Sequence, residues 1–186
     1  IASVESAFRE ITIDGLVSII KYPEQIDSIN GLIIPGGEST SIGKLSNIGN
    51  FHNAIRKKIT QGMPVLGTCA GLIFLSNQIV QSPSNISQNL LGALEIEPER
   101  NAFGRQHDSF QSEFPIPKFG LDKFMGVFIR APRIRSIGSN VEILAKLNDT
   151  IVAVKQGNII ATCFHPELSN TVIFHKYLIE LVRETL

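Results

Sequence analysis

The segment that most constrains this chain is a twelve-residue stretch, PVLGTCAGLIFL, at residues 64–75. Two apolar runs flank a central Gly67-Thr68-Cys69-Ala70-Gly71. Two apolar runs separated by a short segment with two glycines predict a buried strand, a tight turn and a buried helix. Glycines two residues to either side of the cysteine suit the cramped backbone of a nucleophile elbow, which keeps the central side chain clear of the sheet. Unpaired N–H groups at the start of the helix favour a thiolate at Cys69.

The same pentapeptide is also compatible with a buried, unreactive cysteine. Free cysteine is among the most buried residue types, and a Gly-x-Cys-x-Gly pattern also occurs by chance. The catalytic interpretation of this cysteine therefore depends on other parts of the chain.

Length and charge exclude several classes of protein. The chain has 186 residues, which suits a single domain, residues 1–186, with a substantial core. Lys and Arg together number 17, as do Asp and Glu, so we expect neither a nucleic-acid footprint nor a basic membrane-binding patch. The apolar runs are too short to cross a bilayer, and no secretory signal is recognised. Two cysteines make no disulfide framework, and no His/Cys cluster has metal spacing, so we expect a cytoplasmic protein without a metal.

Short apolar runs alternate with amphipathic segments through residue 75. This alternation predicts a parallel sheet that is covered by helices on both faces. Cys69 and the Pro35-Gly36-Gly37 turn each follow a predicted strand, and the carboxyl ends of parallel strands share one edge of the sheet. In this half we expect strands at residues 1–4, 16–20, 31–34 and 65–66 and helices at residues 6–10, from 38–41, at 50–60 and from 72.

From residue 91 onward, the pattern changes to short strands with turn residues between them, and Gln156-Gly157-Asn158 is typical of a hairpin turn. We therefore expect an α/β fold: a three-layer sandwich with a mostly parallel central sheet, flavodoxin-like, with an antiparallel extension in the C-terminal half. An amphipathic helix over residues 171–186, capped by Ser169 or Asn170, completes it. The strands of this half are expected at residues 91–97, 110–114, 125–129, 141–147, 150–155 and 159–164.

The last of these strands leads into His165-Pro166-Glu167. Side chains two residues apart on an extended backbone project to the same side, so Glu167 is placed to orient the His165 ring and to stabilise its protonated form. With Cys69, these residues would make a nucleophile–base–acid triad. A surface histidine beside a solvated carboxylate is the alternative interpretation.

The other polar candidates have simpler interpretations. We expect Cys163 to fill the core, Arg133 and Arg135 to be solvated at the surface, and the remaining histidines to face solvent. Those histidines are His52, His107 and His175.

Three segments at the expected strand ends carry a resemblance to a known family: PGGEST at residues 35–40, GTCAGL at 67–72 and FHPE at 164–167. Their order and spacing are similar to those of the class I (triad) glutamine amidotransferases. The chain most closely resembles the glutaminase subunits of pyridoxal 5′-phosphate synthase. Three further blocks correspond to that family: ERNAFGRQ (99–106), FIRAP (128–132) and AVKQG (153–157). The resemblance covers nearly the whole chain and implies a class I glutamine amidotransferase-like fold.

The resemblance also implies a reaction and roles for named residues. The reaction is hydrolysis of L-glutamine to L-glutamate and ammonia through a thioester on Cys69, with His165 carrying protons and Glu167 orienting it. The backbone N–H of Ala70, beside the nucleophile, and that of Gly37, by resemblance, would form the oxyanion hole. The substrate contacts that it implies are Gly36, Gly37, Glu38, Arg100, Ile129 and Arg130.

The implied partner is a barrel-fold synthase subunit, which takes the ammonia through a dry passage and combines it with two sugar phosphates to make pyridoxal 5′-phosphate. No cofactor is expected on this chain, because it has no phosphate-binding glycine-rich loop of its own. The N-terminus departs from the family: Val4-Glu5-Ser6 stands where the family has Leu-Gln-Gly, and the stretch between Glu10 and Leu16 is short. In the family this edge of the site helps to contact the partner, so the departure affects the prediction of how the partner docks.

Three other functions are open at this point. A glutaminase subunit of another synthase, such as the one in histidine biosynthesis, fits the ERNAFGRQ and FIRAP blocks less well. A Cys-dependent peptidase or deglycase on a similar sheet would place its histidine close after Cys69, where this chain is apolar. A catalytically silent scaffold would not need Cys69, His165 and Glu167 together.

Overall fold

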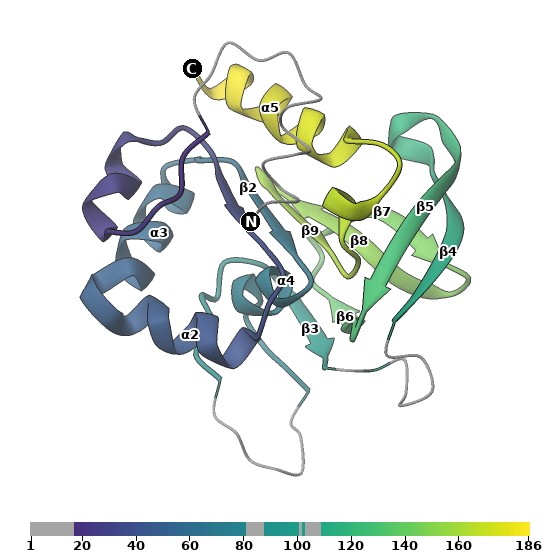
Figure 1. Cartoon of the computed structure of the whole chain (residues 1–186), viewed down its shortest axis with the longest axis horizontal. Coiled ribbons are helices and arrows are strands. Elements are labelled where there is room, and N and C mark those ends of the chain that lie inside the picture. Colours follow the sequence, from purple (N-terminus) through teal and green to yellow (C-terminus); the bar gives the residue numbers. More distant parts are fainter. Residues whose placement is uncertain (1–16, 81–87, 101, 103–108) are drawn as a thin grey trace.

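Apolar strands form the centre of the molecule in the computed structural model, which describes residues 17–80, 88–100, 102 and 109–186 (Figure 1). β1 (Leu32–Ile34), β2 (Val65–Thr68) and β9 (Ile159–Thr162) run parallel to one another. β2 and β9 are buried along their whole length. In Figure 1, α5 lies on one side of these strands, and α2 and α3 lie on the other. Covered faces explain why these strands are continuously apolar instead of alternating.

β9 is the junction between the parallel strands and an antiparallel extension. It runs parallel to β2 and antiparallel to β8 (Thr150–Gln156), across the hairpin predicted at residues 156–158. Among the described residues, the strand order is β1-β2-β9-β8-β6-β3, and β7 (Glu142–Leu147) pairs with β8. β3 (Ile96–Glu99) and β6 (Arg133–Ile137) pair antiparallel. An α/β fold with a parallel sheet and an antiparallel extension is thus confirmed.

Helices follow the parallel strands, as the alternating pattern predicts. Glu38 accepts hydrogen bonds from the backbone N–H groups of Thr40 at 3.0 Å and Ser41 at 2.6 Å, which satisfies donors of the first turn of α2. The described α-helices are α2 (Ser39–Asn47), α3 (Phe51–Thr60), α4 (Ala70–Leu75) and α5 (Ile173–Thr185). The short 3-10 turns include η1 (Pro23–Ser28), η2 (Ile48–Asn50), η4 (Pro117–Phe119) and η5 (Pro166–Leu168). Within the described ranges, none of the helices has the length and apolar character needed to span a membrane.

A two-stranded ribbon packs against the end of β9 through aromatic side chains. The ribbon consists of β4 (Ser109–Ile116) and β5 (Leu121–Ile129). The ring of Phe164, which directly precedes His165, is fully buried. Its centroid lies 5.3–5.7 Å from those of four other buried rings, Phe114, Phe124, Phe128 and Phe174. Rings at this spacing attract one another beyond simple burial, so the cluster fixes the chain just before His165.

Several predicted elements differ from the structure. Residues 17–20 form no strand, because Val17 and Ile19 are 45% and 47% exposed and no neighbouring strand among the described residues pairs with them. The strand expected at residues 91–97 begins only at Ile96. β6 has no counterpart among the predicted strands, because only Ile134 of its RIRSI sequence is buried.

The C-terminal helix begins later than predicted. Val172 is the N-cap of α5, so the expected caps Ser169 and Asn170 are both wrong. The Ser169 hydroxyl instead donates to the carbonyl oxygen of His165 at 3.4 Å and so belongs to the preceding turn. The strand and helix expected at residues 1–4 and 6–10, and the departure at residues 4–6, lie outside the described residues.

Candidate active site

The predicted nucleophile elbow is present, with Cys69 alone between β2 and α4. Cys69 has φ 51° and ψ −101°, a backbone conformation that residues with side chains seldom adopt. Its N–H donates to the carbonyl oxygen of Thr162 in β9 at 2.8 Å. Gly71 allows α4 to approach β1, because a Cβ at this position would overlap the carbonyl oxygen of Ile34. The elbow therefore holds the cysteine at the carboxyl end of the parallel strands.

His165 and Glu167 are in contact, as their spacing predicts. His165 Nδ1 lies 2.9 Å from Glu167 Oε1, and their side chains are only 13% and 7% exposed. Glu167 belongs to η5, so its carboxylate reaches the ring across a 3-10 turn and not along an extended strand. The contact leaves Nε2 as the ring nitrogen that is free of the carboxylate.

Strand β5 supports both halves of this arrangement. The carbonyl oxygen of Val127 accepts a hydrogen bond from the backbone N–H of His165 at 2.8 Å. Two residues further on, the carbonyl oxygen of Ile129 lies 3.8 Å from Cys69 Sγ. The ribbon thus holds the cysteine and the histidine from one side.

The electrostatics of the group favour a charged ring. Burial alone would lower the pKa of His165, but its side-chain hydrogen bonds with Cys69 and Glu167, and their negative charges, raise the pKa to about 9. Burial alone would raise the pKa of Glu167, but the hydrogen bond with His165, a backbone hydrogen bond and the positive charges of His165 and His175 together lower that pKa. At neutral pH the arrangement therefore favours an imidazolium between a sulfur and a carboxylate.

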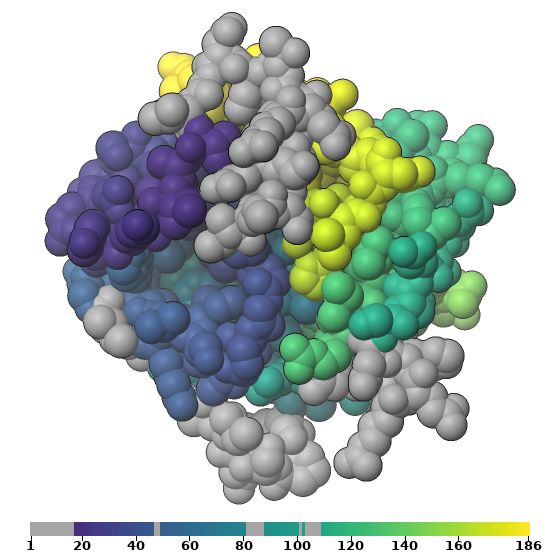
Figure 2. All heavy atoms as spheres, in the orientation of Figure 1, coloured from purple at the N-terminus to yellow at the C-terminus, as the bar shows by residue number. Residues whose placement is uncertain are grey.

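The sulfur and the ring open into a cavity of about 330 Å³. Gly36 lies against the ring, because a Cβ at this position would overlap Cε1 of His165. The outside view in Figure 2 shows α2, the turn after β9 and the end of β5 next to one another on one face. The lining residues are Gly36, Gly37, Glu38, Ser39, Cys69, Ala70, Ile73, Arg100, Ile129, Arg130 and His165. The structure therefore brings every predicted substrate and oxyanion residue to one cavity, with Glu167 behind the ring.

Opposite charges stand on the exposed side of this cavity. Arg100 Nη2 lies 3.4 Å from Glu38 Oε1, and their side chains are 32% and 50% exposed. Hydrogen bonds with Ser41 and Thr40, that with the Ser41 hydroxyl first, lower the pKa of Glu38 to about 2. Such a pair matches the carboxylate and the ammonium of an amino acid.

Two histidines that are expected to face solvent do not. His52 is half-buried, with Nε2 3.0 Å from the carbonyl oxygen of Leu90 and its ring edge-on to Phe74. His175 in α5 is fully buried. Both predictions are wrong because each histidine lies three residues before a buried apolar residue on the inward side of its helix. His107 lies outside the described residues.

His175 adds a buried titratable group near the triad. Burial lowers its pKa, and the negative charge of Glu167 acts in the opposite direction. The interaction is mutual, because His175 is also among the groups that lower the pKa of Glu167. α5 therefore contributes to the electrostatics behind the carboxylate.

The second cysteine is core filler, as predicted. Cys163 is fully buried, and its Sγ lies 3.9 Å from the carbonyl oxygen of Ile151. Burial raises the pKa of its thiol, which makes it a poor nucleophile at neutral pH. The two cysteines are thus distinguished by position, with only Cys69 at the cavity.

Arg133 and Arg135 are paired and not simply solvated, in contrast to the prediction. Arg133 Nη2 and Arg135 Nε each lie 2.8 Å from Glu99 Oε2. The hydrogen bond with Arg133 is the main cause that lowers the pKa of Glu99. Because Glu99 belongs to β3 and the arginines to β6, this group ties the two strands together beside the cavity.

Sequence reasoning missed three residues of the cavity and its rim. Ser39 and Ile73 line the cavity, and Thr40 contacts Arg100. Spacing carried a usable signal for Ile73, because a residue four positions after Cys69 lies one helical turn further on the same face. Thr40 and Arg100 are 60 residues apart in sequence, and no local pattern links them.

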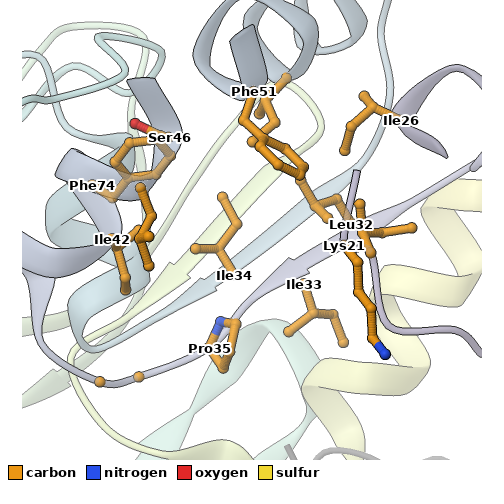
Figure 3. Close-up of a pocket in the computed structure, with 15 residues that line it drawn as sticks. Lys21, Ile26, Leu32, Ile33, Ile34, Pro35, Ile42, Ser46, Phe51 and Phe74 are labelled. Carbon is orange, nitrogen blue, oxygen red and sulfur yellow. The ribbon is translucent and has the colours of Figure 1, made fainter. Parts of the chain in front are cut away.

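A second cavity, of about 540 Å³, adjoins Gly36 and Gly37 and is shown in Figure 3. Apolar side chains surround it, among them Ile34, Phe51 and Phe74. Among the described residues that line it, Lys21 is the only charged one, so the reactive groups belong to the smaller cavity. Across residues 17–80, 88–100, 102 and 109–186, no three His, Cys, Asp or Glu side chains are grouped so that they could hold a metal ion.

Comparison with known proteins identifies the family. A family model described as the SNO glutamine amidotransferase family matches residues 2–184. The chain belongs to this family. SNO membership confirms the resemblance to glutamine amidotransferases that the sequence motifs carry.

Two named relatives and one solved structure are similar to this SNO family chain. A pyridoxal 5′-phosphate synthase subunit PdxT of Nitrosopumilus maritimus is 46% identical over 100% of this chain and 91% of its own length. The protein of the same name in Carboxydothermus hydrogenoformans is 43% identical over 98% of this chain and 96% of its own length. A crystal structure of a glutamine amidotransferase matches with a TM-score of 0.89 at 41% identity, covering 98% of this chain and 93% of that one. The expected amidotransferase-like fold is therefore confirmed.

Proposed function

We propose that this SNO family protein is a glutaminase subunit of pyridoxal 5′-phosphate synthase, which hydrolyses L-glutamine to L-glutamate and ammonia and passes the ammonia to a synthase subunit. The observation that carries the proposal is that His165 contacts both Cys69 and Glu167 beside a cavity with opposite charges at its rim. Relatives named PdxT, at 46% and 43% identity, support this synthase over one of histidine biosynthesis.

The first half of the reaction transfers the glutamyl group to Cys69. The thiolate attacks the side-chain amide carbon, so a C–S bond forms and the carbonyl oxygen becomes an oxyanion. His165, as the imidazolium, gives its proton to the amide nitrogen, because NH₂⁻ does not leave unprotonated. The C–N bond then breaks, ammonia leaves and a thioester remains on Cys69.

The second half hydrolyses the thioester. His165, now neutral, takes a proton from a water molecule, whose oxygen attacks the thioester carbon. The C–S bond breaks, glutamate leaves with the new oxygen, and the thiolate and imidazolium are restored. Glu167 stays hydrogen-bonded to Nδ1 at 2.9 Å throughout, so the same ring nitrogen serves both halves.

The oxyanion needs hydrogen-bond donors. Ala70 is the first residue of α4, and the backbone N–H of that position has no acceptor within its own helix. Gly37 lines the same cavity and supplies the second donor in the proposal. One such donor is typically worth about 3–4 kcal/mol of transition-state stabilisation. Since Gly37 carries no side chain, its peptide is free to turn between a donating and a non-donating orientation, which gives the synthase subunit a means of control.

The charged rim recognises the α-groups of glutamine in this proposal. Arg100 pairs with the α-carboxylate, and Glu38 pairs with the α-ammonium. Ile129 and Arg130, at the end of β5, also line the cavity. These contacts hold the side-chain amide toward Cys69.

A barrel-fold synthase subunit is the partner in this proposal. Ammonia that escapes into water at neutral pH is protonated, and ammonium has no lone pair with which to attack a carbonyl group. Direct transfer through a dry passage to the synthase avoids this loss. The glutaminase rate with and without the synthase subunit tests the control by the partner, and equal rates would remove the need for a Gly37 switch.

Covalent trapping tests the catalytic assignment. The chain is treated with a chloroketone analogue of glutamine, with and without the synthase subunit, and digested for mass spectrometry. We expect the adduct on the peptide that contains Cys69 and none on the peptide that contains Cys163, which serves as the internal control. Glutamate release should be lost in Cys69→Ala, and full turnover by this variant would refute the proposal.

The same assay separates glutaminase activity from that of a cysteine peptidase or deglycase. The residues that follow Cys69 in α4, including Leu72 and Phe74, are buried and apolar, so this helix offers no nearby histidine. Hydrolysis of peptides without turnover of glutamine would favour the peptidase alternative.

A further inference from the structure

Thr40, the second residue of α2, carries a hydroxyl that no step of the reaction uses. We propose that this hydroxyl positions the guanidinium of Arg100 to receive the α-carboxylate of glutamine. Thr40 is then a positioning residue for substrate recognition. The inference rests on the proposed function, in which Arg100 pairs with that carboxylate.

Arg100 reaches the start of α2 through contacts with two residues. Its Nη1 donates to Thr40 Oγ1 at 3.2 Å, and its Nη2 donates to Glu38 Oε1 at 3.4 Å. The same side chain lines the cavity that holds Cys69. A guanidinium has five N–H donors in a rigid plane, so beyond the two that contact Thr40 and Glu38 it has further donors to offer a carboxylate in the cavity.

Glu38 is itself fixed by the helix. Its Oε1 accepts from the Thr40 N–H at 3.0 Å, and its Oε2 accepts from both the N–H and the hydroxyl of Ser41 at 2.6 Å. The attraction of a guanidinium to this stationary charge grows as the two approach. Without the Thr40 hydroxyl, Arg100 therefore turns toward Glu38, and the tighter pair competes with both charged groups of the substrate.

The backbone N–H and the hydroxyl of Thr40 make different contacts, and both are among the groups that lower the pKa of Glu38. The backbone N–H caps α2 through Glu38, whereas the hydroxyl accepts from Arg100. Valine has nearly the shape of threonine and the same backbone, but no hydroxyl. Thr40→Val therefore removes the contact with arginine and retains the helix cap.

Steady-state kinetics of the chain with its synthase subunit test the inference. We expect Thr40→Val to raise the KM for glutamine about tenfold, the loss of one hydrogen bond to a charged group, with kcat within about twofold. Thr40→Ser keeps the hydroxyl and should restore the KM. Thr60→Val is the matched control, because Thr60 ends α3 and its hydroxyl donates to the carbonyl oxygen of Arg56 within the same helix. An unchanged KM in folded Thr40→Val would overturn the inference. A fall in kcat of about tenfold would do so as well.

A double-mutant cycle shows whether Thr40 acts through Arg100. In an Arg100→Ala background, Thr40→Val should change kcat/KM no further, because the group that it positions is gone. Additive effects would mean that Thr40 acts independently and would overturn the inference. Protection of Cys69 from iodoacetamide by glutamine gives the same comparison where turnover is too slow to measure.

Failure of this inference and failure of the proposed function give different results. If the unaltered chain with its synthase subunit releases no glutamate from glutamine, then the proposed function fails. If it releases glutamate and Thr40→Val binds glutamine as well as the unaltered chain does, then only the positioning role fails.

Discussion

The residues proposed to react and those proposed to recognise the substrate line one cavity but differ in how they are held. Cys69 is 7% exposed, and the side chains of His165 and Glu167 are 13% and 7% exposed. Backbone hydrogen bonds from β9 and β5 hold the cysteine and the histidine in place. In contrast, Glu38 and Arg100 have side chains that are 50% and 32% exposed, and side-chain contacts at the start of one helix hold them.

This difference matches what each task requires. Proton transfer needs fixed distances, and the attraction between an imidazolium and a carboxylate is stronger where water is excluded. Recognition of a zwitterion needs charges that the ligand can reach. An exposed ion pair is worth only about 0–1 kcal/mol, so the contact between Glu38 and Arg100 leaves both charges able to attract an incoming amino acid.

The largest effect is expected from a change that displaces the ring of the buried histidine. Gly36→Ala places a Cβ against Cε1 of His165, so the ring has to move. A displacement of about 1 Å at a reacting group costs roughly 100-fold. We therefore expect kcat for glutamine hydrolysis to fall about 100-fold in a protein that remains folded by circular dichroism. An unchanged kcat would show that the buried catalytic residues tolerate movement. The proposed difference between them and the exposed rim would then be wrong.

A smaller effect is expected from removing the charge behind the ring. Glu167 raises the pKa of His165, so the imidazolium persists up to about pH 9. In Glu167→Gln this pKa falls, and the basic limb of the kcat profile moves to lower pH because the acid that protonates the leaving nitrogen is lost earlier. If this pKa falls by one unit, the imidazolium fraction at pH 9 falls from about one half to about one eleventh, so kcat at pH 9 should drop about fivefold.

A carboxylate of the ribbon provides the control for this pH profile. Glu113 pairs with Lys123 at 3.3 Å, and both side chains are largely exposed. Glu113→Gln should leave the basic limb in place. A shift of the same size in both variants would mean that the profile reports overall charge and not the contact behind the ring.

The smallest effect is expected at the surface group beside the cavity. Arg135 Nε lies 2.8 Å from Glu99 Oε2, its side chain is 49% exposed, and Arg133 remains as a second partner of that carboxylate. Arg135→Ala should lower the free energy of unfolding by less than about 1 kcal/mol and leave turnover unchanged, as measured by urea titration and the glutaminase assay. A large loss of turnover would mean that the residues that recognise the substrate extend beyond Glu38 and Arg100.

Local patterns predict the part of the site that lies on the parallel strands. The glycines around Cys69 predict the tight turn, and the spacing of His165 and Glu167 predicts their contact. Each pattern lies within a few residues, and the structure shows both the turn and the contact. A parallel sheet then aligns the strand ends, so distant segments meet without further information.

The parts that sequence reasoning missed depend on contacts between distant residues. Ile134 is the one buried residue of β6, so the charged sequence of this strand does not predict it. The burial of His175 depends on packing that its polar side chain does not indicate. Arg100 and Thr40 meet from separate elements, and hydrogen bonds across such distances leave no periodic signal.

Strand β5 touches the nucleophile through Ile129 and the proton carrier through Val127, two residues apart on one rigid segment. One strand therefore contacts both the sulfur atom of the cysteine and the backbone of the histidine. A substitution that displaces β5 is thus expected to disturb the nucleophile and the base at the same time.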